Sequence, residues 1–405
     1  MRTAIPSALF LEADPAVLRG LASLLRRQLP DWRLAFAATP AQALASLREH
    51  GADVVVSEAD LPEMSGGHFL REVQRERPET VRILFTSYAT DELVTELAPV
   101  AHQMLAKPME ATALGLALRQ AWRLGQMLRE PALRALVSED NRLPVVPRCF
   151  AELSRVMGGT KVSVAEVAEV LECDPGLAAR VMQVARSALF GGRAAPRTVR
   201  DAVVRLGLDL TRGITLSEEL TRLLPHPVAG LSTRAHGLLA LRTGLLLKHM
   251  ARDVDAEDAL MTGIVHGVGK LLLASRRPGL FAECFTESVA RGVDIAEVLD
   301  EKLGATDAEL GAYLLGIWRF PPSIVTAVSR QYRPEAIGPQ GPGACDSLYL
   351  ARRFAADPEV PVVEGIKGVD AGVDAGALRR WGKLAEVAEW RVVARDIVSA
   401  DICCG

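Results

Sequence analysis

The strongest constraint on the fold is an alternation of short apolar runs with amphipathic stretches over the first 124 residues. Apolar runs suited to buried strands cover 8–11, 32–36, 53–57, 82–85 and 103–106. Helical patterns cover 15–29, 40–50, 69–75 and 92–97, and a longer one starts near residue 111. Strands that alternate with helices predict a doubly wound parallel sheet with helices on both faces. We therefore expect an α/β domain with a five-stranded parallel sheet over residues 1–124.

Length and composition favour a multidomain cytoplasmic protein. The 405 residues are 49% hydrophobic, which is enough for two or three separate cores. The first residues form a strand pattern without a cleavage site, so we expect no signal peptide. Arg242 and Lys248 interrupt the most apolar run, so we expect no membrane span. The net charge of −3 gives no general attraction to nucleic acid, and the six cysteines lack metal-type spacing.

Polar side chains stand at the ends of four of the predicted strands. The carboxyl ends of parallel strands form the functional crevice of a doubly wound sheet, so these side chains should converge. They are Glu12 with Ala13, Glu58, Thr86 and Lys107.

The stretches DVVVSEADLPEMSGG at 53–67 and AHQMLAKP at 101–108 resemble the third strand and the final strand of a response-regulator receiver domain. In that family two acids bind Mg²⁺, an aspartate takes a phosphoryl group, and a hydroxyl and a lysine stabilise it. The resemblance places Thr86 and Lys107 in the last two roles. It places Glu58, four residues before Pro62, at the phosphoacceptor position.

Three positions depart from the receiver pattern, because Glu58 replaces the aspartate, Ala13 replaces one acid and Met104 replaces an aromatic switch residue. We expect a pseudo-receiver that takes no phosphoryl group. Glu58 could pair with Lys107 and accept a hydrogen bond from Thr86, which would mimic an active state. Alternatively, it is a tolerated carboxylate in a disused site. Asp60 is a weaker substitute acceptor, because its offset from Pro62 predicts a loop position.

Residues 125–140 predict a helical connector and linker. An apolar stripe continues along the helix from residue 111, and Pro131 is expected to end or kink it. Such a helix could relay motion or form a homodimer, although ordinary core contact is commoner.

Residues 141–337 show almost entirely helical patterns and predict an all-α bundle. Expected helices cover 164–172, 175–187, 199–206, 211–224, 235–252, 257–275, 295–303, 307–318 and 322–332. Residues 338–405 predict a helical extension with helices at 345–355 and 377–399, for which the sequence suggests no function.

Five motifs in this region together resemble the HDOD domain, a signalling module related to HD-type metal phosphohydrolases. They are LPVVP at 143–147, CDPGLAARVMQVARSALFGG at 173–192, RTVRDAVVRLGL at 197–208, HGVGKLLL at 266–273 and DAELGAYLLGIWRFP at 307–321. The resemblance places His236 and His266 at the first two metal-ligand positions. Gly267 stands where the hydrolases carry Asp, and Asp307 stands where some relatives carry His. Without a bridging carboxylate we expect no metal, no cofactor and no hydrolysis, with both histidines acting as packing residues.

Arginines are dense between residues 180 and 212, and the loop within this stretch could contact an anion. The candidates are Arg186, Arg193, Arg197 and Arg200. A solvated basic face is the commoner explanation, and no nucleic-acid motif accompanies it.

These resemblances imply a non-enzymatic bacterial signalling adaptor that acts through protein contacts. Its expected partners are a sensor kinase or the enzymes that make and degrade cyclic-di-GMP. The alternative is a nucleotide sensor, for example of cyclic-di-GMP, that binds at the arginine-rich loop or in the vacated histidine pocket. A regulator controlled by phosphorylation is a third reading.

Overall fold

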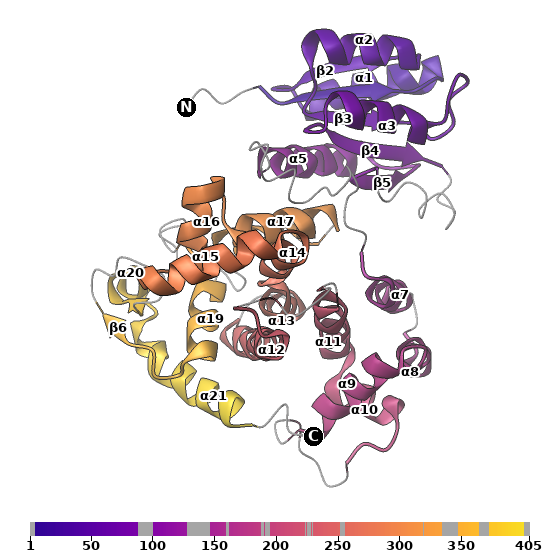
Figure 1. Cartoon of the computed structure of the whole chain (residues 1–405). Coiled ribbons are helices and arrows are strands. Elements are labelled where there is room, and N and C mark those ends of the chain that lie inside the picture. Colours follow the sequence, from indigo (N-terminus) through magenta and orange to yellow (C-terminus); the bar gives the residue numbers. More distant parts are fainter. Residues whose placement is uncertain are drawn as a thin grey trace. The chain divides into compact units, whose positions relative to one another are not determined.

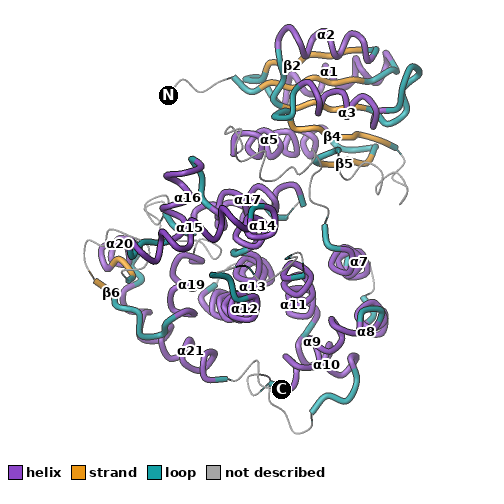
Figure 2. Tube along the Cα trace, viewed as in Figure 1, coloured by secondary structure: helices purple, strands orange, loops and turns teal. Residues whose placement is uncertain are grey.

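The computed structural model describes residues 5–87, 100–127, 146–158, 162–187, 190, 195–222, 224, 228, 230–251, 256–318, 320–333, 347–363 and 372–400. Near Val145 the chain divides into two compact units, one α/β and one helical (Figures 1 and 2). Within these described ranges we find no helix with the length and apolar character that crossing a bilayer requires.

The first unit contains the predicted five-stranded parallel sheet, which is confirmed. The strands are β1 (Ser7–Leu11), β2 (Arg33–Ala37), β3 (Val54–Ser57), β4 (Val81–Thr86) and β5 (Gln103–Ala106). Their order is β2-β1-β3-β4-β5, with every pair parallel. The described helices are α1 (Pro15–Gln28), α2 (Pro40–His50), α3 (Gly66–Glu76) and α5 (Ala111–Met127). The helix predicted at 92–97 lies outside the described residues.

Alternate residues of each strand face opposite sides of the sheet and build two separate cores. Phe10 of β1 packs on the side that carries α1 and α5, where Leu25 and Leu118 are fully buried. Its neighbour Leu11 packs on the side of α2 and α3, beside Leu47 and Phe69. Both faces are therefore covered, which leaves the strand ends as the place where polar side chains can gather.

The helices of this unit begin where short polar side chains bond to exposed backbone N–H groups. Asp14 accepts hydrogen bonds from the N–H groups of Ala16 and Val17, and Pro15 occupies the first helical position. Ser65 caps α3 in the same way by accepting from His68 N. Local sequence thus fixes how the chain leaves β1 and where it enters α3.

The second unit is a helical bundle, as predicted. Its helices are α7 (Arg148–Met157), α8 (Val164–Glu172), α9 (Pro175–Arg186), α10 (Val199–Leu206), α11 (Leu208–Thr221), α12 (Thr233–Met250), α13 (Ala256–Val265), α14 (Val268–Arg276), α15 (Pro278–Arg291), α16 (Ile295–Leu303), α17 (Asp307–Ile317), α18 (Pro322–Arg330), α19 (Leu348–Ala356), α20 (Ala375–Arg380) and α21 (Val387–Ser399). Helix α12 is central, because α11, α13, α19 and α21 all pack against it (Figure 1).

Several element predictions for this unit were wrong. The helix expected at 257–275 is two helices, α13 and α14, because the chain turns at His266 and Gly267. The helix expected at 377–399 breaks at Gly382, whose φ of 66° lies in the left-handed region that glycine tolerates. The short parallel strands β6 (Val362–Val363) and β7 (Val373–Asp374), and the helices α7 and α15, were not predicted.

The predicted extension is an integral part of the bundle. Arg242 of α12 donates to the backbone oxygen of Val398, 3.1 Å away. The rings of Phe354 in α19 and Trp390 in α21 lie 6.1 Å apart, and both side chains are buried. The extension therefore packs along one side of α12 through α19 and α21 (Figure 2).

We predict that Gly263→Ala destabilises the bundle, because α12 and α13 approach at two glycines. A Cβ on Gly263 would lie 2.3 Å from Gly244 Cα, and backbone cannot yield as a side chain can. Overpacking of this kind costs about 1–3 kcal/mol. Urea unfolding followed by helical circular dichroism measures it. The control is Gly279→Ala, where a Cβ meets nothing within 4 Å; equal effects of the two substitutions would contradict the prediction.

Candidate functional site

In the first unit, three charged side chains meet at the carboxyl ends of β1, β3 and β5. Lys107 Nζ donates to Glu12 Oε2 at 2.6 Å and also contacts Glu58 Oε2. Only 17% of the Lys107 side chain is exposed, against 8% for Glu12 and 13% for Glu58. The ammonium group thus sits between two carboxylates in a site largely closed to water.

Backbone contacts hold both carboxylates in place. Asp14 N donates to Glu12 Oε1 at 3.0 Å, and Ala59 N donates to Glu58 Oε1 at 2.8 Å. Each carboxylate therefore uses one oxygen for the backbone and the other for Lys107. A Cβ on Gly66 would lie 1.9 Å from the Glu58 backbone oxygen, so only glycine permits this approach of α3 to the loop.

The electrostatics favour a charged Lys107. Burial by itself would lower the pKa of Lys107, but the hydrogen bonds and negative charges of Glu12 and Glu58 outweigh it and hold the pKa above its ordinary value. Lys107 Nζ also lies 5.1 Å from the centre of the Phe85 ring.

The structure also describes the remaining predicted receiver positions. Thr86 is buried at the end of β4, and the Lys107 backbone N–H donates to its backbone oxygen at 2.8 Å. Met104 is half-buried and packs against the core under α2 and α3. Ala13 offers no oxygen ligand. Asp60 is exposed in the loop after β3, as its spacing predicted. With Ala13 in place of an acid, these residues do not fit Mg²⁺, which needs several oxygen ligands in near-octahedral order.

In the second unit His266 lies in the turn between α13 and α14 and is only 5% exposed. Its Nδ1 donates to the backbone oxygen of Gly263 at 2.6 Å. The Gln331 side-chain amide donates to the His266 backbone oxygen at 2.9 Å. His266 is thus fixed by local contacts, and the turn it occupies splits the helix that the sequence pattern had predicted as continuous.

The ring of His236, on α12, packs directly against Gly267. A Cβ on Gly267 would lie 2.2 Å from His236 Cε1 and 2.8 Å from its Nε2. The imidazole therefore occupies the space into which a side chain at position 267 would extend. An aspartate at this position could not coexist with this position of the ring.

Asp307 is buried at the start of α17, where it faces Tyr332. The Tyr332 hydroxyl donates to Asp307 Oδ2 at 3.0 Å. Burial raises the pKa of the Asp307 carboxyl, and burial together with the Asp307 charge raises that of Tyr332. Within the described ranges Asp307 Oδ1 has no hydrogen-bond partner.

The arrangement does not fit the divalent metal of the hydrolase relatives. Among the described residues, no three His, Cys, Asp or Glu side chains lie close enough together to hold a metal ion. His266 Nδ1 donates to Gly263, so only its Nε2 could meet a metal, and Gly267 supplies no carboxylate beside it. A hydrolytic centre needs a fixed metal with an open position for water, which this donor set does not supply.

Three of the four predicted loop arginines lie among the described residues. Arg186 donates to the backbone oxygen of Pro196, at 3.3 Å from Nε and 3.1 Å from an Nη, and so closes its loop. Arg197 and Arg200 are exposed at the start of α10, and Arg193 lies outside the described residues.

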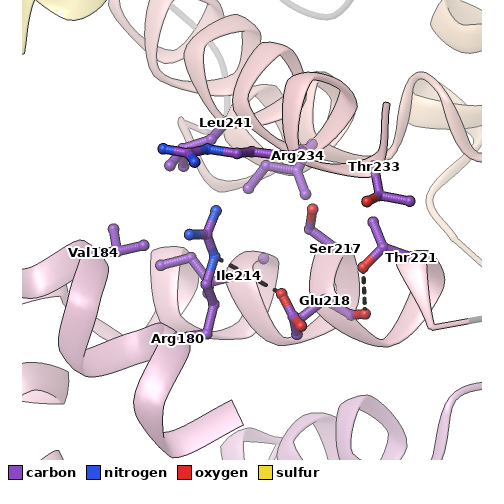
Figure 3. Close-up of a pocket in the computed structure, with 12 residues that line it drawn as sticks. Arg180, Val184, Ile214, Ser217, Glu218, Thr221, Thr233, Arg234 and Leu241 are labelled. Atoms are coloured by element: carbon purple, nitrogen blue, oxygen red, sulfur yellow. Dashed lines mark hydrogen bonds and ion pairs between the residues drawn. The ribbon is translucent and has the colours of Figure 1, made fainter. Parts of the chain in front are cut away.

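A neighbouring small cavity of about 210 Å³ lies between α9, α11 and α12. Figure 3 shows Arg180 rising beside Glu218, with Arg234 crossing from the facing helix. The Arg180 guanidinium lies 3.8 Å from the Glu218 carboxylate. An anion in this cavity would therefore have to compete with Glu218.

Sequence reasoning missed a second group of cations. Lys270 of α14 and Arg352 and Arg353 of α19 line one cavity of the bundle. Lys270 belongs to the HGVGKLLL motif, so its position next to the histidine pair was a usable signal. Nothing in the sequence indicated that two arginines of the extension would join it.

Two known domain families match the chain, one in each of its two units. A model of the response regulator receiver domain matches residues 8–119, and a model of the HDOD domain matches residues 143–334. The chain therefore contains a receiver domain followed by an HDOD domain. It spans 37% and 66% of the lengths of two curated relatives that it matches.

Solved structures of bacterial proteins resemble each part. The receiver domain of an HD domain-containing protein from Pseudomonas fluorescens Pf-5 is 31% identical, with 30% of this chain and 98% of that one covered and a TM-score of 0.29. An HDOD protein of unknown function from Geobacter sulfurreducens is 20% identical, with 66% and 97% covered and a TM-score of 0.51. A protein provisionally named a phosphohydrolase, from Shewanella amazonensis SB2B, is 28% identical, with 67% and 99% covered and a TM-score of 0.48.

We predict that the two histidines make the bundle sensitive to acid. Burial lowers the pKa of His236 to about 4 and that of His266 to about 3, whereas both should titrate near 6.5 when unfolded. Their contribution to stability is complete above pH 6.5. As the pH falls from 6.5 toward these lowered values, only the unfolded chain gains protons, so the free energy of unfolding decreases.

The variant His266→Gln tests this sensitivity. Each histidine should contribute a slope of about 1.4 kcal/mol per pH unit within its window, and the variant should lose one such contribution. Urea unfolding between about pH 6 and about pH 4.5, with a chelator present throughout, measures the slope. An unchanged slope in the variant would show that His266 is not held neutral in the folded bundle.

Proposed function

We propose that this protein is a non-enzymatic adaptor in bacterial signal transduction, which acts through protein contacts. The union of a receiver domain with an HDOD domain supports a signalling role. The adaptor mechanism rests on the present state of two sites, the Lys107 cluster of the receiver domain and the His236–His266 pair of the HDOD domain. Its natural setting is the cytoplasm, where both domains would meet other signalling proteins.

The observation that carries the proposal is the ion pair of Lys107 with Glu12 and Glu58. A receiver's phosphoryl group must reach an aspartate and must be charge-balanced by a metal ion and the lysine. Here the acceptor is Glu58, and its outer oxygen already contacts the lysine. Because Lys107 already contacts both carboxylates, the site is filled by its own side chains, which favours a receiver held permanently in one state.

The second site supports the same conclusion. The His236 ring lies against Gly267, and His266 bonds to the backbone of its own turn. A hydrolase would also need a carboxylate beside the two imidazoles to complete its metal site, and position 267 supplies none. We therefore assign the histidines to packing, so that the HDOD domain presents a surface and catalyses no reaction.

The partners that fit this mechanism are signalling proteins such as a sensor kinase or the enzymes that make and degrade cyclic-di-GMP. A homodimer formed along α5 would also fit, since Leu116 on that helix is an exposed apolar side chain, 62% accessible. A nucleotide sensor at the arginine-rich loop is less well supported, because Arg186 is bonded to Pro196.

We predict that the wild-type chain gains no phosphoryl mass when incubated with acetyl phosphate and Mg²⁺. The reason is that Glu58 is paired with Lys107 and that Ala13 supplies no metal ligand. A double variant, Glu58→Asp with Ala13→Asp, should gain one phosphoryl group, because it restores both the acceptor and the acid. Intact-protein mass spectrometry measures the increment.

Capture experiments with the wild-type chain and with a chain lacking residues 1–130 test the contact mechanism. Proteins captured from the native cell by the wild-type chain should be the same with and without acetyl phosphate, and a chain lacking residues 1–130 should lose the receiver's partners. Stoichiometric phosphorylation of the wild-type chain, or capture that depends on acetyl phosphate, would contradict the proposal.

A further inference from the structure

The cavity of about 210 Å³ between α9, α11 and α12 is the starting point for a further inference, because its lining includes neither His236 nor His266. Liquid water takes up about 30 Å³ per molecule, so the space corresponds to roughly seven waters. It is smaller than the range of about 300–1,000 Å³ that is typical of sites for larger organic ligands. The volume therefore suits a small molecule and is too small for a nucleotide.

The inner wall of this cavity is apolar. Four side chains that are each at most 5% exposed form it, namely Val184, Ile214, Leu241 and Ile264. All four belong to one hydrophobic core of the bundle. The cavity is thus a recess at the edge of that core, and its inner end suits a short apolar group.

The outer part of the cavity is polar. Ser217 and Thr221 of α11 and Thr233 of α12 line it with three hydroxyl groups. The Thr221 hydroxyl donates to the backbone oxygen of Glu218 at 2.8 Å. Because a hydroxyl can both donate and accept, this part suits a ligand that carries polar groups of either kind.

The charged side chains of the lining are already engaged with one another. Arg180 lies 3.8 Å from one oxygen of Glu218 and donates to Gln183 Oε1 at 2.7 Å, and Arg222 lies 3.7 Å from the other oxygen of Glu218. An added anion would face Glu218, whereas an added cation would face Arg180 and Arg234 (Figure 3). A ligand without net charge avoids both penalties.

The geometry leaves room for charged groups of a ligand that is neutral as a whole. The Arg180–Glu218 separation of 3.8 Å exceeds the length of a direct hydrogen bond, which is about 2.7–3.2 Å. A carboxylate accepts several hydrogen bonds and a guanidinium donates up to about five, so neither group has to lose a present partner. Figure 3 shows Glu218 and Arg234 on facing helices, which would place a ligand's two charges at opposite sides of the cavity.

Gly237 of α12 keeps this space open. A Cβ there would lie 3.8 Å from Ser217 Oγ on the facing helix, which is an ordinary contact distance. A side chain at position 237 would therefore extend into the cavity without a clash at its first atom. This position offers a way to fill the cavity from within.

We propose that this cavity binds a small zwitterionic amino acid of about the size of valine. Its ammonium group bonds to Glu218, its carboxylate bonds to Arg234 and the Ser217 hydroxyl, and its side chain lies against the apolar inner wall. Charge-assisted hydrogen bonds at both ends fix its orientation. Such a site gives the HDOD domain a small-molecule input that does not depend on the receiver domain or on the proposed protein contacts.

Calorimetry on the full chain tests the proposal with L-valine and four analogues that each lack one feature. Isovalerate lacks the ammonium group, isobutylamine lacks the carboxylate, isovaleramide lacks both charges, and glycine lacks the apolar side chain. We expect L-valine to bind and each analogue to bind at least about tenfold more weakly, because each loses a charge-assisted contact or the burial of apolar surface.

Variants of the lining locate the ligand. Glu218→Gln should weaken L-valine binding at least about tenfold and remove the preference for L-valine over isovalerate. Gly237→Leu should abolish binding because it fills the cavity. The control Glu169→Gln alters an exposed carboxylate of α8 and should leave binding unchanged.

Circular dichroism checks that each variant is folded. If Gly237→Leu fails to give the wild-type spectrum, Gly237→Ala, which adds a single methyl group, replaces it and should weaken binding by a smaller factor. Three results would overturn the proposal: no binding of L-valine, binding of any analogue as tight as that of L-valine, or unaltered affinity in the variants at positions 218 and 237.

Discussion

The receiver half of this molecule depends on one shared ammonium group. Lys107 stands between Glu12 and Glu58, which come from the ends of two neighbouring strands, and it ties both to the end of β5. Loss of one partner from a largely buried ion pair leaves a charge without compensation and costs far more than the pair contributes. With Ala13 and Glu58 at these positions two carboxylates remain, and Lys107 offsets the charge of one of them while it contacts both.

The helical half shows the same outcome by a different physical route. Here the decisive feature is a missing side chain, because Gly267 leaves space that the His236 ring fills. Packing, rather than charge, closes the site. The polar groups left nearby are used locally: His266 bonds to Gly263, and Asp307 bonds to Tyr332. Both domains retain their folds because the cores lie in alternating strand residues and in helix stripes, away from these positions.

The sequence predicted the sheet fully, because alternating apolar runs report directly on burial, and it predicted that Glu12, Glu58 and Lys107 would converge. It could not predict the break at His266, because the pattern of apolar residues continues through the turn and the break depends on a side chain bonding to Gly263. The sequence also could not predict that Lys270, Arg352 and Arg353 line one cavity. Lys270 and Arg352 are 82 positions apart in the chain, and only the packing of α19 on α12 shows that they share a wall.

We propose that neither inherited site performs chemistry, and the metal content of the purified full chain tests this proposal most directly. After exposure to manganese, iron and zinc, followed by removal of loosely held ions, elemental analysis should find far less than one metal ion per chain, and no hydrolysis of phosphodiester substrates should accompany it. Near-stoichiometric metal that His236→Ala or His266→Ala abolishes would contradict the account, because it would show that the two imidazoles still form a working centre.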